Sequence, residues 1–196
     1  MRTRDENKEQ AIRQQAIEMI VKYGLEGFSM QKLAKAANVS PATMYIYYQD
    51  KEDLVLSLGT EVFNKMQLYS LKNFSSDLSF DEGLKLQWKN RAAFFLENPL
   101  DVQFIEHLRY SPAFRTISHT IKNSFKAEMG KFVHNAVLRG ELVQLPFEVY
   151  WSVAFSPLYQ LMKFHTQGES YASSSFELTD EVMDQTLQVV LKALKP

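Results

Sequence analysis

Apolar residues recur at helical spacing along almost the whole chain. A first stripe occupies positions i, i+4, i+7, i+8 and i+11 and consists of Ile12, Ala16, Met19, Ile20 and Tyr23. Gly24 is expected to end this helix, and residues 24–27 (GLEG) to form a short connector. Because no alternating pattern of useful length occurs, the sequence predicts an all-α fold.

Two short helices follow, over residues 30–37 and 41–48. Ser29 and Ser40 precede them and are typical N-cap residues, whose hydroxyl oxygens accept backbone N–H groups of the first turn. Between the helices, Asn38 is expected to take the left-handed conformation, since its short polar side chain tolerates that conformation best after glycine. This spacing is typical of a helix-turn-helix.

A fourth helix is predicted to start after Asp50, its N-cap, and to carry an apolar residue every four positions: Leu54, Leu58, Val62 and Met66. Residues 73–79 (NFSSDLS) are rich in serine and indicate a connecting loop. Beyond it the pattern predicts helices at about 81–97, 101–110, 113–139, 146–168 and 177–194.

The third helix carries three tyrosines in four residues. A tyrosine combines apolar bulk with a hydroxyl that can reach a phosphate oxygen or a base edge. From their helical positions, Tyr48 is expected to anchor the core and Tyr47 to contact a phosphate. The part of the Tyr45 side chain next to the backbone is expected to pack against the protein, and its ring to touch a thymine methyl.

The start of this helix offers small residues, so that the backbone can approach base edges closely. The predicted DNA-binding set is therefore Ser29, Ser40, Pro41, Ala42, Thr43, Tyr45, Tyr47 and Lys51. Lys51 opens the next helix and is placed to reach a phosphate. Arg2 and Arg4 are predicted to form a loose arm along a groove.

The stretch FSMQKLAKAANVSPATMYIYYQDKEDLV resembles the N-terminal DNA-binding domain of the tetracycline-repressor (TetR) family of regulators. The matching positions are Ala34, Ala37, Val39, Ser40, Thr43, Tyr45, Tyr47, Tyr48, Lys51 and Leu54. Two positions depart from the family pattern: Asn38 stands where glycine is usual, and Tyr48 where phenylalanine is usual. Both changes are physically mild.

The resemblance implies an omega-shaped homodimer in which residues 1–53 bind DNA and residues 54–196 bind a small effector and dimerise. Effector binding would change the spacing of the two DNA-binding heads, with the long fourth helix as the transmitting element. The expected activity is release of operator DNA when an apolar or aromatic effector binds. This effector is expected to carry an acidic or hydroxyl group for His107 or Arg109.

The C-terminal helices are rich in aromatic residues, and an apolar cavity with a few polar groups is the usual ligand site. The predicted effector pocket consists of Trp88, Phe104, His107, Tyr110, Phe125, Trp151 and Tyr159. Each of these side chains could instead pack in the core. The predicted dimer interface, on the last two helices, consists of Tyr150, Phe155, Met183, Leu187, Val190 and Leu191. The alternative is that the last helix closes the core of its own chain.

Charge and composition exclude some kinds of site but do not by themselves indicate a function. The net charge is −1, and the first 49 residues carry seven Lys and Arg against five Asp and Glu, so charge alone does not indicate a nucleic-acid partner. There is no cysteine, which excludes disulfides and thiolate metal sites. The N-terminus lacks the apolar run of a signal peptide, and a cytoplasmic location is expected.

No catalytic constellation is recognised. The four histidines show no i, i+3 or i+4 pairing, there is no glycine-rich phosphate loop, and no cofactor, metal or catalytic activity is expected. Three hypotheses remain: a ligand-controlled repressor, a helical adaptor that keeps the head but answers to a protein partner, and a helical enzyme or carrier of small molecules.

Overall fold

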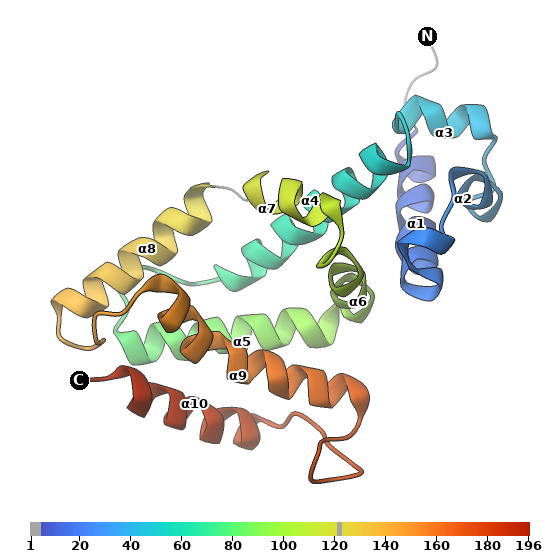
Figure 1. Cartoon of the computed structure of the whole chain (residues 1–196). Helices are drawn as coiled ribbons and strands as arrows, with labels where there is room; N and C mark the ends of the chain where they lie inside the picture. Colours follow the sequence, from blue (N-terminus) through green and yellow to red (C-terminus); the bar gives the residue numbers. More distant parts are fainter. Residues whose placement is uncertain (1–4, 121–122) are drawn as a thin grey trace. The chain divides into compact units, whose positions relative to one another are not determined.

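A computed structural model describes residues 5–120 and 123–196, and every regular element in these residues is a helix (Figure 1). In chain order the elements are α1 (Glu6–Gly27), α2 (Met30–Ala36), α3 (Pro41–Tyr47), α4 (Lys51–Ser70), α5 (Phe80–Glu97), α6 (Pro99–Leu108), α7 (Pro112–Thr120), α8 (Asn123–Leu138), α9 (Phe147–Gln167) and α10 (Asp180–Leu194). The all-α prediction is confirmed. None of the helices in the described residues is long and apolar enough to cross a membrane.

The chain folds into two compact units, each made of two separate stretches. The first comprises Met1–Met66 and Glu97–Lys122, and the second Gln67–Leu96 and Asn123–Pro196. The first unit therefore contains α1–α3, most of α4, and α6 and α7. The second contains α5 and α8–α10.

Most local signals at the start of the first unit act as predicted, but residues 25–27 continue α1 instead of forming the predicted connector. Gly24 has φ 70° and ψ 172°, which interrupts regular helix geometry inside α1. Asn38 adopts φ 53° between α2 and α3, the left-handed conformation that the turn requires. The Asp50 carboxylate accepts the Asp53 backbone N–H at 2.8 Å and so caps α4. Tyr48 is buried, as expected of a core anchor.

Helices α4, α6 and α7 complete the first unit. Gly59 allows their close approach, because a Cβ built there would lie 2.3 Å from Ile117 Cδ1 and 3.0 Å from Leu108 Cδ1. Helix α6 also packs on α1, and His107 Nε2 lies 3.2 Å from the Val21 carbonyl oxygen. The helix-turn-helix thus belongs to one compact unit with helices from later in the chain.

The second unit is built on one apolar core shared by α5, α8, α9 and α10. Trp88 is fully buried there and donates its indole N–H to the Ala154 carbonyl oxygen at 2.8 Å. At Gly83, a Cβ would meet the Phe132 ring at 2.2 Å, so α5 and α8 are in direct contact at that point. Helices α9 and α10 pack side by side (Figure 1).

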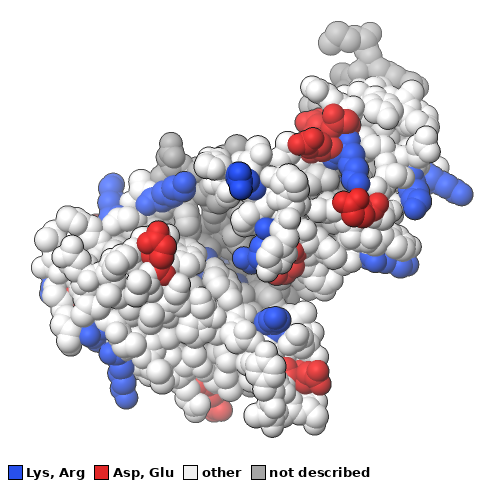
Figure 2. Space-filling model, viewed as in Figure 1, with Lys and Arg blue, Asp and Glu red and all other residues white. Residues whose placement is uncertain are grey.

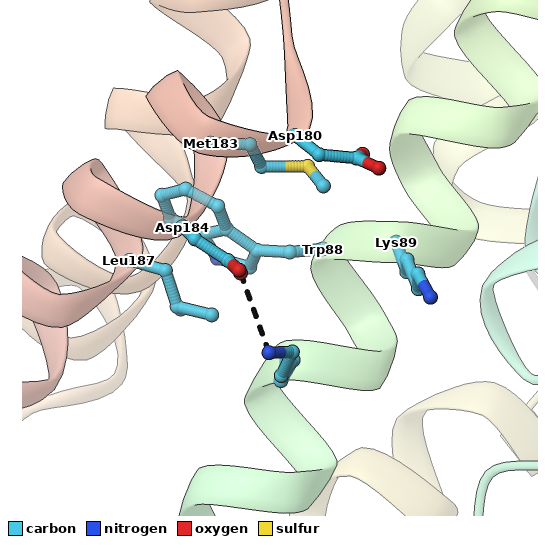
Figure 3. A pocket seen from close by; sticks show the side chains of 7 residues that line it. Trp88, Lys89, Asp180, Met183, Asp184 and Leu187 are labelled. Atoms are coloured by element: carbon cyan, nitrogen blue, oxygen red, sulfur yellow. Dashed lines mark ion pairs between the residues drawn. The ribbon is translucent and has the colours of Figure 1, made fainter.

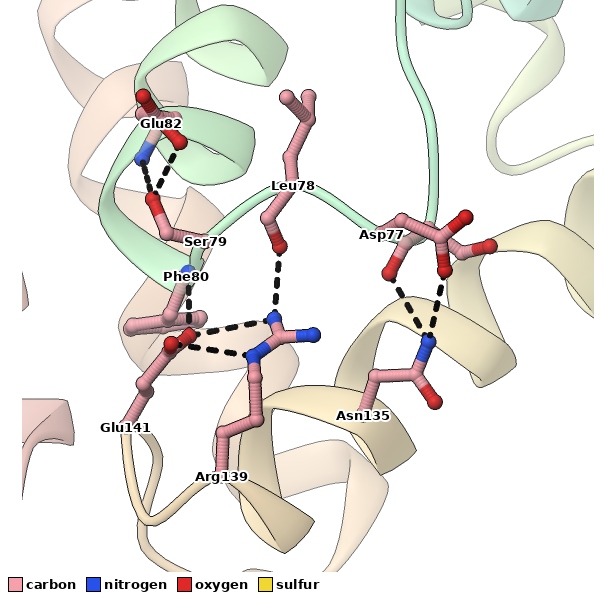
Figure 4. A network of polar contacts seen from close by, with 9 residues as sticks. Asp77, Leu78, Ser79, Phe80, Glu82, Asn135, Arg139 and Glu141 are labelled. Atoms are coloured by element: carbon pink, nitrogen blue, oxygen red, sulfur yellow. Dashed lines mark hydrogen bonds and ion pairs between the residues drawn. The ribbon is translucent and has the colours of Figure 1, made fainter.

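The single helix predicted over residues 113–139 corresponds to α7 and α8, which belong to different units, and residues 121–122 between them lie outside the described residues. The predicted loop at residues 73–79 lies between α4 and α5, as expected. Arg139 fixes the C-terminal end of this loop by donating to the Leu78 carbonyl oxygen at 2.7 Å (Figure 4). It also pairs with Glu141, whose carboxylate accepts the Phe80 N–H.

Candidate functional site

One face of α3 is exposed to solvent and carries small residues at its N-terminal end. Pro41 and Ala42 are exposed, and Tyr45 projects with 60% of its surface accessible. Thr43 is half-buried, and its hydroxyl shares a hydrogen bond of 2.8 Å with Ser40. These side chains form a compact outward surface at the N-terminal end of α3, which we call the α3 face.

Ser29 and Ser40 serve as helix caps. The Ser29 Oγ accepts the Lys32 N–H at 3.3 Å, and the Ser40 Oγ accepts the Thr43 N–H at 3.1 Å. Both hydroxyl groups are therefore engaged in holding α2 and α3 in place.

Tyr47 has a different partner from the predicted phosphate. Its side chain is 7% exposed, and its hydroxyl accepts the Asp5 N–H at 2.9 Å and donates to the Asp5 carbonyl oxygen at 3.1 Å. A phosphate oxygen can only accept, and the single phenolic proton is already given to Asp5. The structure thus corrects the expected role: Tyr47 ties the start of α1 to the end of α3.

Lys51 also has an internal partner. Its ammonium group donates to the Leu25 carbonyl oxygen at 2.6 Å and lies 5.8 Å from the centre of the Phe28 ring. Because an ammonium group has three donors, this bond leaves others for a phosphate. The predicted phosphate contact therefore stays a prediction.

The surface charge is mixed. On the face shown in Figure 2, Lys and Arg side chains are scattered among Asp and Glu rather than gathered in one patch. This distribution agrees with the net charge of −1. The predicted arm residues, Arg2 and Arg4, lie outside the described residues.

The structure divides the seven predicted pocket residues between the two units. Phe104, His107 and Tyr110 belong to the first unit, where Phe104 is core, His107 is exposed and Tyr110 is 92% exposed. An almost fully exposed ring lines no enclosed cavity, so Tyr110 is removed from the pocket. The other four, which lie in the second unit, are Trp88, Phe125, Trp151 and Tyr159.

A small hollow lies between α5 and α10, next to Trp88 (Figure 3). Its volume is about 100 Å³, and the ion pair between Lys85 and Asp184, 3.4 Å long, crosses its wall. Ligand pockets usually measure roughly 300–1,000 Å³. Another hollow, beside residues 79–81 and 195–196, contains none of the seven predicted side chains.

The second unit also buries a charged residue that the sequence reasoning missed. Arg91 is 5% exposed, and its guanidinium carbon lies 4.4 Å from the centre of the Phe155 ring and 5.3 Å from that of Trp151. It donates to the Tyr159 hydroxyl at 2.9 Å and to the Gln87 Oε1 at 3.2 Å. In the described residues, no carboxylate lies within ion-pairing distance of Arg91.

Tyr150 lies on the same aromatic group. Its ring centre is 6.4 Å from that of Phe155, and its buried hydroxyl has no hydrogen-bond partner in the described part of the chain. Burial raises the pKa of this hydroxyl well above its ordinary value, although the nearby Arg91 charge acts in the opposite direction. We call Gln87, Arg91, Tyr150 and Tyr159 the buried polar cluster.

A sequence signal for this cluster existed. Gln87 and Arg91 occupy consecutive positions of an apolar stripe spaced four, three, four and three residues apart, whose other members are Phe80, Leu84 and Phe94. An arginine in such a stripe indicates a buried cation.

The six predicted dimer-interface residues are core residues of the single chain. Their side chains are all buried within the second unit: Tyr150, Phe155, Met183, Leu187, Val190 and Leu191. A side chain already covered by its own chain has little surface left to bury against a partner. The last helix thus does close its own core, which was the alternative reading.

Comparison with known proteins identifies the architecture. Residues 12–58 match the family described as "Bacterial regulatory proteins, tetR family". An uncharacterized HTH-type transcriptional regulator of Haemophilus influenzae is 26% identical over 177 residues, which cover 90% of each chain. A TetR-family transcriptional regulator structure from Haemophilus influenzae has a TM-score of 0.79 at 24% identity, over 97% of this chain and 98% of the other, and shows the shared fold.

A further solved structure carries the assignment. It is a TetR family transcription regulator from Marinobacter aquaeolei VT8, 30% identical, with a TM-score of 0.74 over 100% of this chain and 99% of the other. The likeness thus extends from the helix-turn-helix through both units. Sequence and fold together make this chain a member of the TetR family of transcriptional regulators.

Proposed function

We propose that the protein is a cytoplasmic repressor that leaves its operator when a small apolar or aromatic effector binds. Residues 1–53 would bind DNA, residues 54–196 would bind the effector and dimerise, and no catalytic step is required. The observation that carries the proposal is the α3 face: exposed Pro41, Ala42 and Tyr45 on a helix held by the Ser40 cap.

A homodimer is part of the proposal, since two recognition helices must lie about one DNA turn apart, roughly 34–36 Å, to enter successive major grooves. Exposed apolar side chains of α9 and α10 support it. There, apolar residues that the single chain leaves partly or fully exposed include Val149, Val182, Val189 and Ala193. These replace the six core residues as the proposed contact.

The test is fluorescence anisotropy with DNA from just upstream of the protein's own gene, at several salt concentrations. We expect saturable binding that weakens as salt rises, with a modest slope because the first 49 residues carry only two more Lys and Arg than Asp and Glu. Tyr45→Ala is expected to weaken binding about 10-fold or more, the loss of one base contact.

The control is Tyr171→Ala, which removes a tyrosine of the second unit that is even more exposed than Tyr45. It should bind DNA like the wild type. Equal affinity for the upstream DNA and a scrambled duplex, followed by failure of genome-wide site selection, would contradict the proposal and favour the protein-adaptor alternative.

A further inference from the structure

The buried polar cluster contains a cation without an anion. Water-free surroundings penalise an unpaired charge strongly, and buried charges in proteins are normally paired. Within the described residues, Arg91 has hydrogen bonds only to neutral oxygens, those of Gln87 and Tyr159. Residues 1–4 and 121–122, the ones not described, include no Asp or Glu that could supply the missing charge.

Two donors of the cluster are unused as well. The Nε–H of Arg91 and the hydroxyl of Tyr150 are buried, and neither has a partner in the described residues. Such groups are rare in native proteins and call for an explanation. A carboxylate can accept both kinds of bond, because it takes bidentate hydrogen bonds from a guanidinium edge and a further bond from a hydroxyl.

The surroundings define the rest of such a ligand. The rings of Trp151 and Phe155 lie against the guanidinium, so the group next to the carboxylate must be apolar. Lys85 and Lys89 are exposed on α5 and lie outside the buried stripe. One guanidinium matches one negative charge, which favours a monocarboxylate over a phosphate dianion.

Tyr159 links the cluster to the surface, since its side chain is 37% exposed while its hydroxyl accepts from Arg91. We infer that Arg91 and Tyr150 bind the carboxylate of an amphipathic organic acid, whose apolar part packs among the neighbouring aromatic rings. That this acid acts as the effector rests on the proposed function. The binding site itself does not.

The experiment compares acids with their neutral amides. Decanoate and 4-phenylbutyrate are titrated into the full-length protein by calorimetry and thermal shift, beside decanamide and 4-phenylbutanamide. We expect at least one acid to bind about 10-fold or more tightly than its amide, the usual effect of a hydrogen bond to a charged group. Equal affinities of each acid and its amide would overturn the inference.

The key variant is Arg91→Met, which keeps the apolar stem and removes the charge. It should fold, because an apolar residue of similar volume replaces an unpaired buried cation, and it should lose the preference for acids. Lys89→Met removes the same charge from the exposed side of α5 and should keep that preference. Tyr150→Phe, which leaves the ring in place, should weaken acid binding several-fold and serves if Arg91→Met does not fold.

Operator binding is measured in the same samples. If the wild type binds its operator but neutral compounds bind and release it as well as acids do, the carboxylate inference is wrong and the repressor function stands. If acids bind through Arg91 while no DNA is bound, the repressor proposal fails and the carboxylate site stands. An acid preference that persists in Arg91→Met also overturns the inference.

Discussion

The two units treat their polar side chains in opposite ways. At the head, the hydroxyls of Ser29, Ser40 and Tyr47 all bond nearby backbone groups. In the second unit, Arg91 and Tyr150 keep buried donors that have no acceptor in the described part of the chain. A surface that reads DNA gains from a rigid helix whose own groups are paired, whereas an interior that receives a small molecule needs donors left for the ligand.

The largest expected effect comes from Gln87. Its amide donates to the Ser70 carbonyl oxygen at 2.7 Å and its Oε1 accepts from Arg91. Gln87→Leu should lower the free energy of unfolding by about 1–3 kcal/mol, because it removes an acceptor from a buried guanidinium. Urea denaturation measures this loss.

A double variant sharpens the result. In Gln87→Leu/Arg91→Met both polar partners are apolar, and part of the lost stability should return. If Gln87→Leu alone is as stable as the wild type, the buried polar cluster does not depend on internal pairing, and the contrast between the units is broken.

At the head, Tyr47→Phe tests the opposite side of the contrast. Loss of the hydroxyl removes two hydrogen bonds to the Asp5 backbone, yet the ring stays packed. The expected decrease in unfolding free energy is about 0.5–1.5 kcal/mol. Faster hydrogen exchange of the Asp5 amide, measured by NMR against a neighbouring α1 amide, would locate the effect, and unchanged exchange would contradict it.

The smallest effect concerns acid stability. The hydrogen bond from Arg139 lowers the pKa of Glu141 below its ordinary 4.5, so its stabilising contribution is present above that pH and is lost as the pH falls below it. This partly exposed pair should contribute less than about 1 kcal/mol. Melting curves at pH 6 and pH 3 should show a larger drop for the wild type than for Glu141→Gln, and identical drops would exclude the effect.

Local chemistry explains what the sequence could predict. The caps at Ser29, Ser40 and Asp50 and the left-handed turn at Asn38 depend on residues within four positions, so spacing alone was sufficient. The roles of Tyr47 and Lys51 were less accessible, because their partners Asp5 and Leu25 are 42 and 26 residues away.

The second unit shows the limit more clearly. The amphipathic stripe on α10 predicts that one face of this helix is buried. It does not indicate whether that face packs on its own chain or on a second copy. The pocket prediction failed at Tyr110 for a related reason, since aromatic content does not reveal which rings converge. The surroundings of Arg91 depend on the packing of α9 on α5, so the sequence alone does not show that this residue lacks a counter-ion.

The interleaved make-up of the units has a consequence for folding. The chain enters the first unit, leaves it after Met66, starts the second, returns at Glu97, and leaves again after Lys122. During synthesis, Gly59 of α4 therefore stays uncovered until Leu108 and Ile117 have been made. Such long-range closure slows folding, and a nascent chain released near residue 70 should expose the apolar side of α4 to chaperones.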